Sequence, residues 1–230
     1  MPSFRVAQVR VGRPKPFGLQ GQPSAIIKKP AKGPVMATEA GLAGDEQGDK
    51  KNHGGCHKAI HAYAVHHYPT WASEHPAQPR KFRAGSFGEN LVVEDVTEGD
   101  ICLGDQWHIG GALCEVSQGR QPCWKLNLRF GLPDMAYRVQ RSGRTGWYFR
   151  VLEEGLIVAG VKAELLSRPN PSWDLDRVSR LLYHDTLDVA ALSDFVDLPA
   201  LPLSWQSLAR RRLETGKVEN WTPRIATPME

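Results

Sequence analysis

Apolar and polar residues alternate over several short segments of the chain, as in strands that bury one face. Residues 4–11 (FRVAQVRV) predict a first strand. Further strand-like runs are residues 90–94, 99–104, 106–109, 112–116, 146–152 and 156–165. Gly110-Gly111 favours one hairpin, and Glu153-Glu154-Gly155 favours a second between the last two runs. Many short strands at close spacing indicate a β-barrel or a sandwich.

Helical spacing occurs in two parts of the chain. Residues 58–75 (KAIHAYAVHHYPTWASEH) have apolar positions that suit one or two short helices, interrupted near Pro69. After a loop-like SRPNPS at 167–172, leucines at helical intervals predict three helices. These cover residues 175–183, 186–196 and 204–215, and Thr186 with Asp188 and Ser204 are suitable starts for the last two.

The change of pattern near residues 168–171 predicts a division of the chain. Residues 1–166 form a mainly β domain, and residues 167–230 form a small three-helix domain. The second part has no cysteine, and His184 is its only histidine, so we expect it to be a structural or docking element. Removing it should leave a folded barrel. The overall class is mainly β with α.

Composition limits the expected cellular location and the classes of binding partner. The chain has 230 residues and neither a secretion signal nor an apolar run of membrane length, so a cytoplasmic protein without a membrane partner is expected. Its net charge of +4 is +5 in residues 1–166 and −1 in residues 167–230, and the excess in the first part favours a small anionic ligand. No basic run is dense enough to predict nucleic-acid binding.

One cysteine has chemically informative neighbours. The four cysteines are widely spaced and form no CxxC pair, which is typical of thiols in a reducing compartment. Cys123 follows Pro122 within GRQPCWKLNLRFG, among the cations Arg120, Lys125 and Arg129. Nearby cations favour the reactive thiolate. A buried structural thiol beside a basic strip is an equally good interpretation of composition alone.

A histidine-rich segment allows a zinc interpretation. His53, Cys56, His57 and His61 are all potential ligands. Gly54-Gly55 would break a helix between His53 and the others, and the spacing matches no common zinc pattern. Hydrogen-bonding histidines at a turn are the better interpretation.

Two further segments suit contact with a ligand. AGSFGENL at 84–91 predicts a tight loop whose backbone approaches a ligand, or an ordinary loop before a strand. In SAIIKKPAKGP at 24–34, Lys28, Lys29 and Lys32 are either solvated or bound to a phosphate. Spacing does not decide between these alternatives.

Taken together, the motifs resemble the MOSC family of molybdenum-cofactor proteins, and in particular its YiiM-type members. They occur in the family's order: SAIIKKP, GLAGDEQGD, HGGCHKAIHAY, GSFGENL, GDICLGD, QPCWKLN and GRTGWYFRVLEEG. The leucine-rich tail resembles the three-helix domain that follows the barrel in those members. The resemblance implies a β-barrel that binds a pterin-bound molybdenum in a cleft.

The resemblance also implies roles for individual residues. Cys123 aligns with the family's cysteine and would be the catalytic residue, as molybdenum ligand or sulfur carrier. Candidate cofactor-binding residues are Lys28 and Arg120 for the phosphate, with Gly88, Glu89, Asn90 and His53 around the pocket. His57 stands where the family commonly has an acidic residue, and Cys56 beside it is unusual, so the role of that acid is in doubt here.

The activity implied is the reduction of small N-hydroxylated compounds, such as N-hydroxylated base analogues that need detoxification. The chain has neither a cysteine cluster for an iron–sulfur centre nor a GxGxxG fingerprint, so a separate redox protein would supply electrons. The alternative is a sulfur-transfer or molybdenum-cofactor carrier protein that uses a Cys123 persulfide. A third alternative is a binding module that docks through its tail. The sequence leaves the oligomeric state open, with a homodimer as one option.

Overall fold

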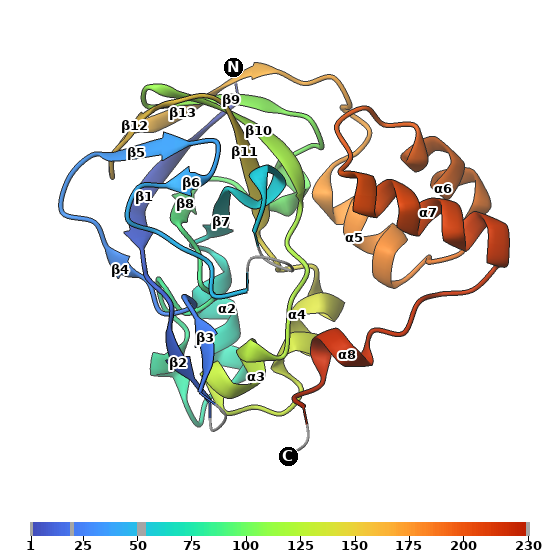
Figure 1. The fold of residues 1–230 in the computed structure, drawn as a ribbon, viewed down its shortest axis with the longest axis horizontal. Coiled ribbons are helices and arrows are strands. Elements are labelled where there is room, and N and C mark those ends of the chain that lie inside the picture. The colour runs from blue at the N-terminus through green and yellow to red at the C-terminus, as the bar shows by residue number, and fades with distance from the viewer. Residues whose placement is uncertain (1, 19–20, 50–53, 229–230) are drawn as a thin grey trace.

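Seven strands close into a barrel in this computed structural model, which describes residues 2–18, 21–49 and 54–228 (Figure 1). The strands in barrel order are β13 (Lys162–Ser167), β9 (Gln106–Ile109), β10 (Ala112–Gly119), β11 (Trp147–Glu153), β7 (Ile60–Ala64), β8 (Leu91–Glu94) and β1 (Ser3–Val11). Pairing of β1 with β13 closes the ring. All neighbours are antiparallel except β7 and β8, so the barrel is mixed.

Short strands extend the barrel at its rim. Strand β4 (Lys29–Pro30) adds to β1. A small sheet contains β12 (Gly155–Ile157), β5 (Val35–Thr38) and β6 (Gly41–Leu42), and a separate ribbon pairs β2 (Lys15–Phe17) with β3 (Gln22–Ser24). The predicted mainly β architecture followed by C-terminal helices is therefore confirmed.

Helices surround one end of the barrel and form the C-terminal part (Figure 1). The α-helices are α2 (His67–Glu74), α3 (Lys125–Phe130), α4 (Met135–Ser142), α5 (Leu175–Tyr183), α6 (Val189–Val196), α7 (Leu203–Thr215) and α8 (Thr222–Ile225). Short 3-10 turns are η1 (Cys56–Lys58), η2 (Pro79–Lys81) and η3 (Glu98–Asp100). No helix in the described part of the chain is long and apolar enough to cross a bilayer.

The apolar core of the barrel continues into the C-terminal helices. Trp107 and Phe149 of the barrel belong to the same buried cluster as Leu181 of α5, Phe195 of α6 and Trp205 of α7. Backbone hydrogen bonds also join the two parts, from Leu103 N to Trp173 O and from Leu175 N to Ile101 O. The helices therefore pack on the barrel as part of its core.

Four local predictions are wrong. Residues 60–64, predicted to be helical, form β7, which is buried on both faces between β11 and β8. A continuous apolar run does not distinguish such a strand from a buried helix. Pro69 lies in the first turn of α2, where a missing N–H is harmless, so it does not interrupt that helix.

The other two errors concern strands. Residues 99–104 form the end of η3 and an isolated bridge from Cys102 to Asp174, and no strand. The second predicted hairpin is absent because β12 pairs with β5, while β11 pairs with β10 and β7. Gly155 lies so close to the Gly111 backbone that a Cβ there would clash, so this position requires glycine.

Candidate functional site

Cys123 lies in a short loop between β10 and α3. The loop begins at Arg120, whose N–H donates to Gly146 O over 2.9 Å, and ends where Leu126 N bonds Cys123 O at the start of α3. Cys123 is 8% exposed and lines a cavity. Two other cysteines are less suitable nucleophiles, because burial raises the pKa of Cys102 to about 11 and that of Cys114 to about 12.

The structure brings most of the predicted site residues around this cavity. The cavity has a volume of about 600 Å³, part of it open to solvent, and its wall includes Lys28, Gly88, Asn90, Arg120 and Cys123. The charged groups of the lining are the cations Lys28, Lys58, Arg120 and Lys125 and the carboxylates Asp45, Glu46 and Asp49. The sequence predicts no cavity role for Tyr148, and for His61 only hydrogen bonding at a turn, yet both line the cavity. We call this space the basic cavity.

Arg120 is the best-placed anion-binding group of the basic cavity. It is 7% exposed, and its Nη1 is buried without a hydrogen-bond partner among the described residues. A buried cationic donor without a partner is costly unless a ligand or water satisfies it. Arg120 also interacts with the Tyr148 hydroxyl, whose pKa is raised by burial and lowered in part by this arginine. The guanidinium is therefore held in place with one donor left for an anion.

Lys28 lies in the same wall but is already paired. Its Nζ donates to both carboxylate oxygens of Asp45, and the pair is almost fully buried. Asp45 also accepts from Gly12 N over 2.7 Å and from Asn90 Nδ2 over 2.9 Å. Burial lowers the pKa of Lys28, and Asp45 opposes that shift. Lys28 therefore contributes less net positive charge than Arg120.

The loop at 85–90 is built around Glu89, which supports the cavity from outside its lining. The Glu89 carboxylate accepts from Tyr68 Oη at 2.5 Å, from Phe87 N at 2.9 Å and from Gly85 N. Gly88 adopts a positive φ of 79°, and a Cβ there would lie 3.1 Å from Ile26. Gly88 and Asn90 thus line the cavity, while Glu89 fixes the loop that carries them.

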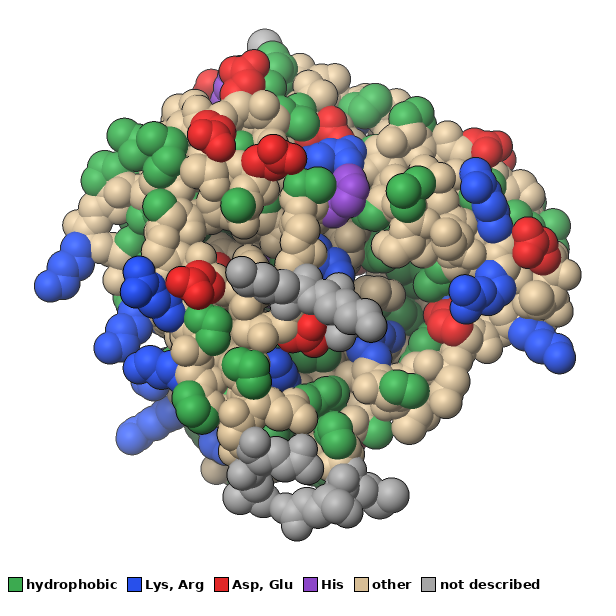
Figure 2. Space-filling view, in the orientation of Figure 1, with side chains coloured by type: hydrophobic (Ala, Val, Ile, Leu, Met, Phe, Trp, Pro, Cys, Tyr) green, Lys and Arg blue, Asp and Glu red, His purple; other side chains and the backbone are tan. Residues whose placement is uncertain are grey.

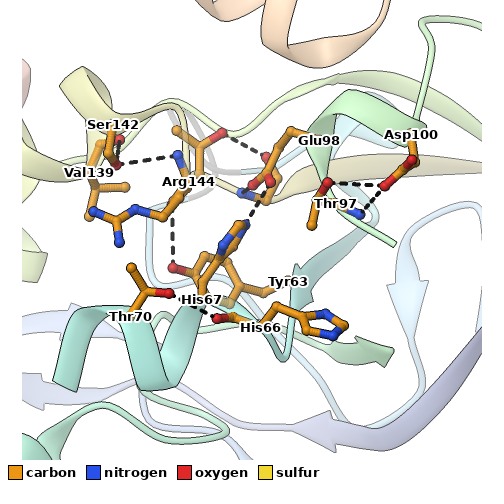
Figure 3. Close-up of polar contacts among 12 residues, drawn as sticks. Tyr63, His66, His67, Thr70, Thr97, Glu98, Asp100, Val139, Ser142 and Arg144 are labelled. Carbon is orange, nitrogen blue, oxygen red and sulfur yellow. Dashed lines mark hydrogen bonds and ion pairs between the residues drawn. The ribbon is translucent and has the colours of Figure 1, made fainter. Parts of the chain in front are cut away.

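A buried polar network lies behind the backbone of Gly146 and Arg120 (Figure 3). Glu98 accepts from His67 Nε2 at 2.6 Å and from Gly146 N at 2.7 Å. Gly146 in turn holds the Arg120 backbone. Next to it, His61 Nε2 lies 3.3 Å from Thr145 O, and burial together with Arg120 lowers the pKa of His61 to about 3. His61 is therefore a neutral group of the wall at physiological pH.

A second hollow lies on the other side of Cys123. Its lining shares Cys123, Tyr148, Asp49 and Lys58 with the basic cavity, and adds Gln121, Trp124, Ser204, Trp205, Leu208, Pro223 and Arg224. Figure 2 shows the surface hollowed between the barrel and the C-terminal helices. Arg224 also bonds the Cys123 loop directly, so residues 167–230, expected to be a structural or docking element, contribute side chains next to Cys123.

The histidine-rich segment is only partly described. His53, predicted to bind cofactor, lies outside the described residues, and no cluster of three potential metal ligands occurs within them. His57 does not line either space, and its Nδ1 lies 3.0 Å from Arg150 Nη1. Arg150 is paired with Glu115, so a carboxylate is present beside His57. The histidine at position 57, where the family commonly has an acidic residue, therefore lies outside the lining of both spaces.

Comparison with known proteins identifies the family. Residues 49–164 match the MOSC domain, and residues 173–216 match the YiiM-like, 3-alpha helix domain. The chain belongs to the MOSC family. The Escherichia coli protein YiiM is 37% identical over 206 residues, which are 90% of this chain and 92% of that protein.

Other relatives agree with this assignment. A Gibberella moniliformis protein named reductase is 39% identical over 211 residues, which are 91% of this chain but only 37% of that longer protein. The crystal structure of YiiM from Escherichia coli has a TM-score of 0.80 at 31% identity, covering 95% of this chain and 99% of that one. YiiM from Geobacillus stearothermophilus gives 0.78 at 34%, with 91% and 99% covered.

Proposed function

We propose that this protein is the catalytic subunit of a molybdenum-dependent reductase of small N-hydroxylated compounds. The observation that carries the proposal is that Cys123 and Arg120 line one cavity, and that the buried Arg120 Nη1 has no hydrogen-bond partner among the described residues. A thiolate is a suitable soft ligand for molybdenum, and a guanidinium suits a phosphate. These residues fit a pterin-bound molybdenum with its phosphate. The match to a protein named reductase supports the redox class.

The cofactor, when bound, would supply two-electron redox chemistry at the metal. Converting an N–OH group to N–H and water consumes two electrons and two protons. Because the sequence has no iron–sulfur or dinucleotide motif, a separate redox protein would supply the electrons.

The chain's own residues would bind the cofactor phosphate, orient the substrate and supply a proton. Arg120 would hold the phosphate, with Lys28, Lys125 and the Gly88–Asn90 backbone around it. Substrate would approach Cys123 from the second hollow, whose wall includes Trp124 and Trp205. Lys58 lies where the two spaces meet, and burial lowers its pKa, so it releases a proton more readily than an exposed lysine.

The test is metal analysis combined with turnover. Protein purified from a host that makes the molybdenum cofactor should contain molybdenum and reduce an N-hydroxylated base analogue with an artificial donor. Cys123→Ser should lose most of both, because a hydroxyl is a harder and less acidic ligand than a thiolate. Cys56→Ser is the matched control, since Cys56 is partly exposed and lines neither space.

Two results would argue against the proposal. Wild-type molybdenum content and turnover in Cys123→Ser would remove Cys123 from the site. Cyanide-releasable sulfur on Cys123 in protein that holds no molybdenum and reduces nothing would instead favour the sulfur-transfer alternative.

A further inference from the structure

The backbone on both sides of Cys123 is bonded by a single distant residue. Arg224 Nη1 donates to Pro122 O over 2.5 Å, and Arg224 O accepts from Trp124 N over 2.8 Å. Pro122 has no N–H, and the Cys123 carbonyl is occupied by Leu126 N. The peptide groups that flank the thiol therefore depend on the C-terminal segment for their hydrogen bonds.

Arg224 is itself fixed by the barrel and by α5. Its Nη2 donates to Gln140 Oε1 over 2.5 Å, and Gln140 is 1% exposed on α4. The guanidinium also lies 5.8 Å from the centroid of the Tyr183 ring at the end of α5. Tyr183 interacts in turn with the Gln121 side chain, one residue before Pro122. The planar guanidinium thus has three partners at defined positions, which a flexible lysine would not reproduce.

The residues next to Arg224 attach to α3. Asn127 Nδ2 donates to Ile225 O over 2.9 Å and to Thr227 Oγ1 over 3.2 Å. Asn127 Oδ1 accepts from Ala136 N, so the same side chain joins α3, α4 and the tail. In Figure 1 the chain leaves α7, returns past the helices and places α8 beside α3 and α4. Residues 221–227 thus form an ordered clamp on the Cys123 loop.

We propose that Arg224 is a positioning residue for Cys123, and that residues 221–227 are a working part of the site. Arg224 holds the loop so that the thiol faces the basic cavity, and with Pro223 it closes one side of the second hollow. The functional meaning of this rests on the role proposed for Cys123. The mechanical claim is independent of that role, because it can be measured on protein that contains no cofactor.

The test measures how fast iodoacetamide alkylates each cysteine of the full-length apo-protein, with peptide mass spectrometry as readout. Arg224→Ala removes both guanidinium hydrogen bonds, and Cys123 should react about tenfold faster as the loop opens locally. Arg224→Lys should restore part of the protection through Pro122 O. A chain ending at Gly216 loses the backbone bond as well and should be at least as reactive as Arg224→Ala.

Three internal references separate positioning from general instability. Arg211→Ala, exposed on α7, should leave the Cys123 rate unchanged, and the Cys56 rate should be the same in all variants. Cys114 is fully buried and reports global unfolding. If Arg224→Ala accelerates Cys114 as well, Arg224→Lys carries the test, and Cys123 alone must then react about threefold faster than in the wild type.

The inference is overturned if Cys123 stays within twofold of the wild-type rate in folded Arg224→Ala and in the chain ending at Gly216. Failure of the proposed function is a different result, namely molybdenum retained by Cys123→Ser. The two can be told apart because the alkylation experiment uses no metal.

Discussion

Lys28 and Asp45 form a buried ion pair in the wall of the basic cavity, with Nζ within hydrogen-bonding distance of both carboxylate oxygens. This pairing changes what Lys28 offers a ligand. A lysine chosen from sequence as a phosphate contact is, in the fold, largely committed to a carboxylate. Arg120 Nη1, which has no hydrogen-bond partner in the part of the chain that the structure describes, is the stronger candidate for an anion.

The first prediction tests the Lys28–Asp45 ion pair by its effect on the free energy of unfolding. Lys28→Ala leaves Asp45 buried without its counter-charge and should lower the free energy of unfolding by about 3 kcal/mol. Lys29→Ala removes an exposed neighbour and should cost less than about 0.5 kcal/mol. Urea denaturation of the apo-protein measures both. Equal stability of the two variants would mean that the ion pair does not hold the cavity wall together.

The second prediction concerns anion affinity. Arg120→Ala should weaken retention of the cofactor by about 1–3 kcal/mol, as expected for loss of a charge-assisted hydrogen bond. Molybdenum per chain after dialysis, from a cofactor-producing host, is the measurement. Arg13→Ala, exposed and outside the cavity, is the control. Undiminished retention in Arg120→Ala would place the phosphate elsewhere.

A third prediction follows from the lowered pKa of His61, about 3 in the folded protein against an ordinary 6.5. Above pH 6.5 the residue is neutral in both states and has no effect. As pH falls from 6.5 toward 3, only the unfolded chain takes up the proton, so the free energy of unfolding decreases by up to about 1.4 kcal/mol per pH unit. His61→Gln should flatten this acid slope because an amide does not titrate. The glutamine can still donate to Thr145 O, so the fold should be kept.

The comparison for this prediction is His108→Gln, which alters an exposed histidine on β9. Unfolding curves of the apo-proteins at several pH values between 7 and 4 would be compared. The same acid slope in wild type and His61→Gln would show that His61 accepts a proton in the folded state.

The sequence predicted the parts of this fold that depend on local pattern. The alternation in residues 4–11 and the leucine spacing in 175–183 correspond to β1 and α5. The sequence pattern did not predict secondary structure correctly where tertiary contacts determine it. Strand β7 has apolar residues on both faces because the barrel covers both, and no periodicity marks such a strand.

The candidate site shows the same division. Cys123 and Arg120 lie in one short segment that the family resemblance singles out, and both line the basic cavity. Tyr148 and His61 reach the basic cavity from other strands, and Arg224 lines the second hollow from more than one hundred residues away in the chain. The sequence around these residues does not show which of them meet, because closure of the barrel and return of the tail bring them together.

The last prediction concerns the division of the chain near residue 167. A chain ending at residue 166 loses Trp173, Leu181 and Phe195, which share the buried cluster of the barrel. It also loses Arg168, which pairs with the fully buried Asp105 at 2.7 Å. Exposed apolar area and an unpaired buried carboxylate both oppose folding, so this fragment should aggregate or unfold at low urea concentration.

A chain ending at Gly216 is the matched comparison, because it keeps α5, α6 and α7 and removes only the clamp on the Cys123 loop. It should stay monodisperse and unfold in one cooperative transition, within about 3 kcal/mol of the full chain. Size-exclusion chromatography and urea denaturation of both fragments make the comparison. A soluble, cooperatively folded 1–166 fragment of near-wild-type stability would show that the barrel is an independent unit, and that the continuous apolar core does not make its folding depend on the helices.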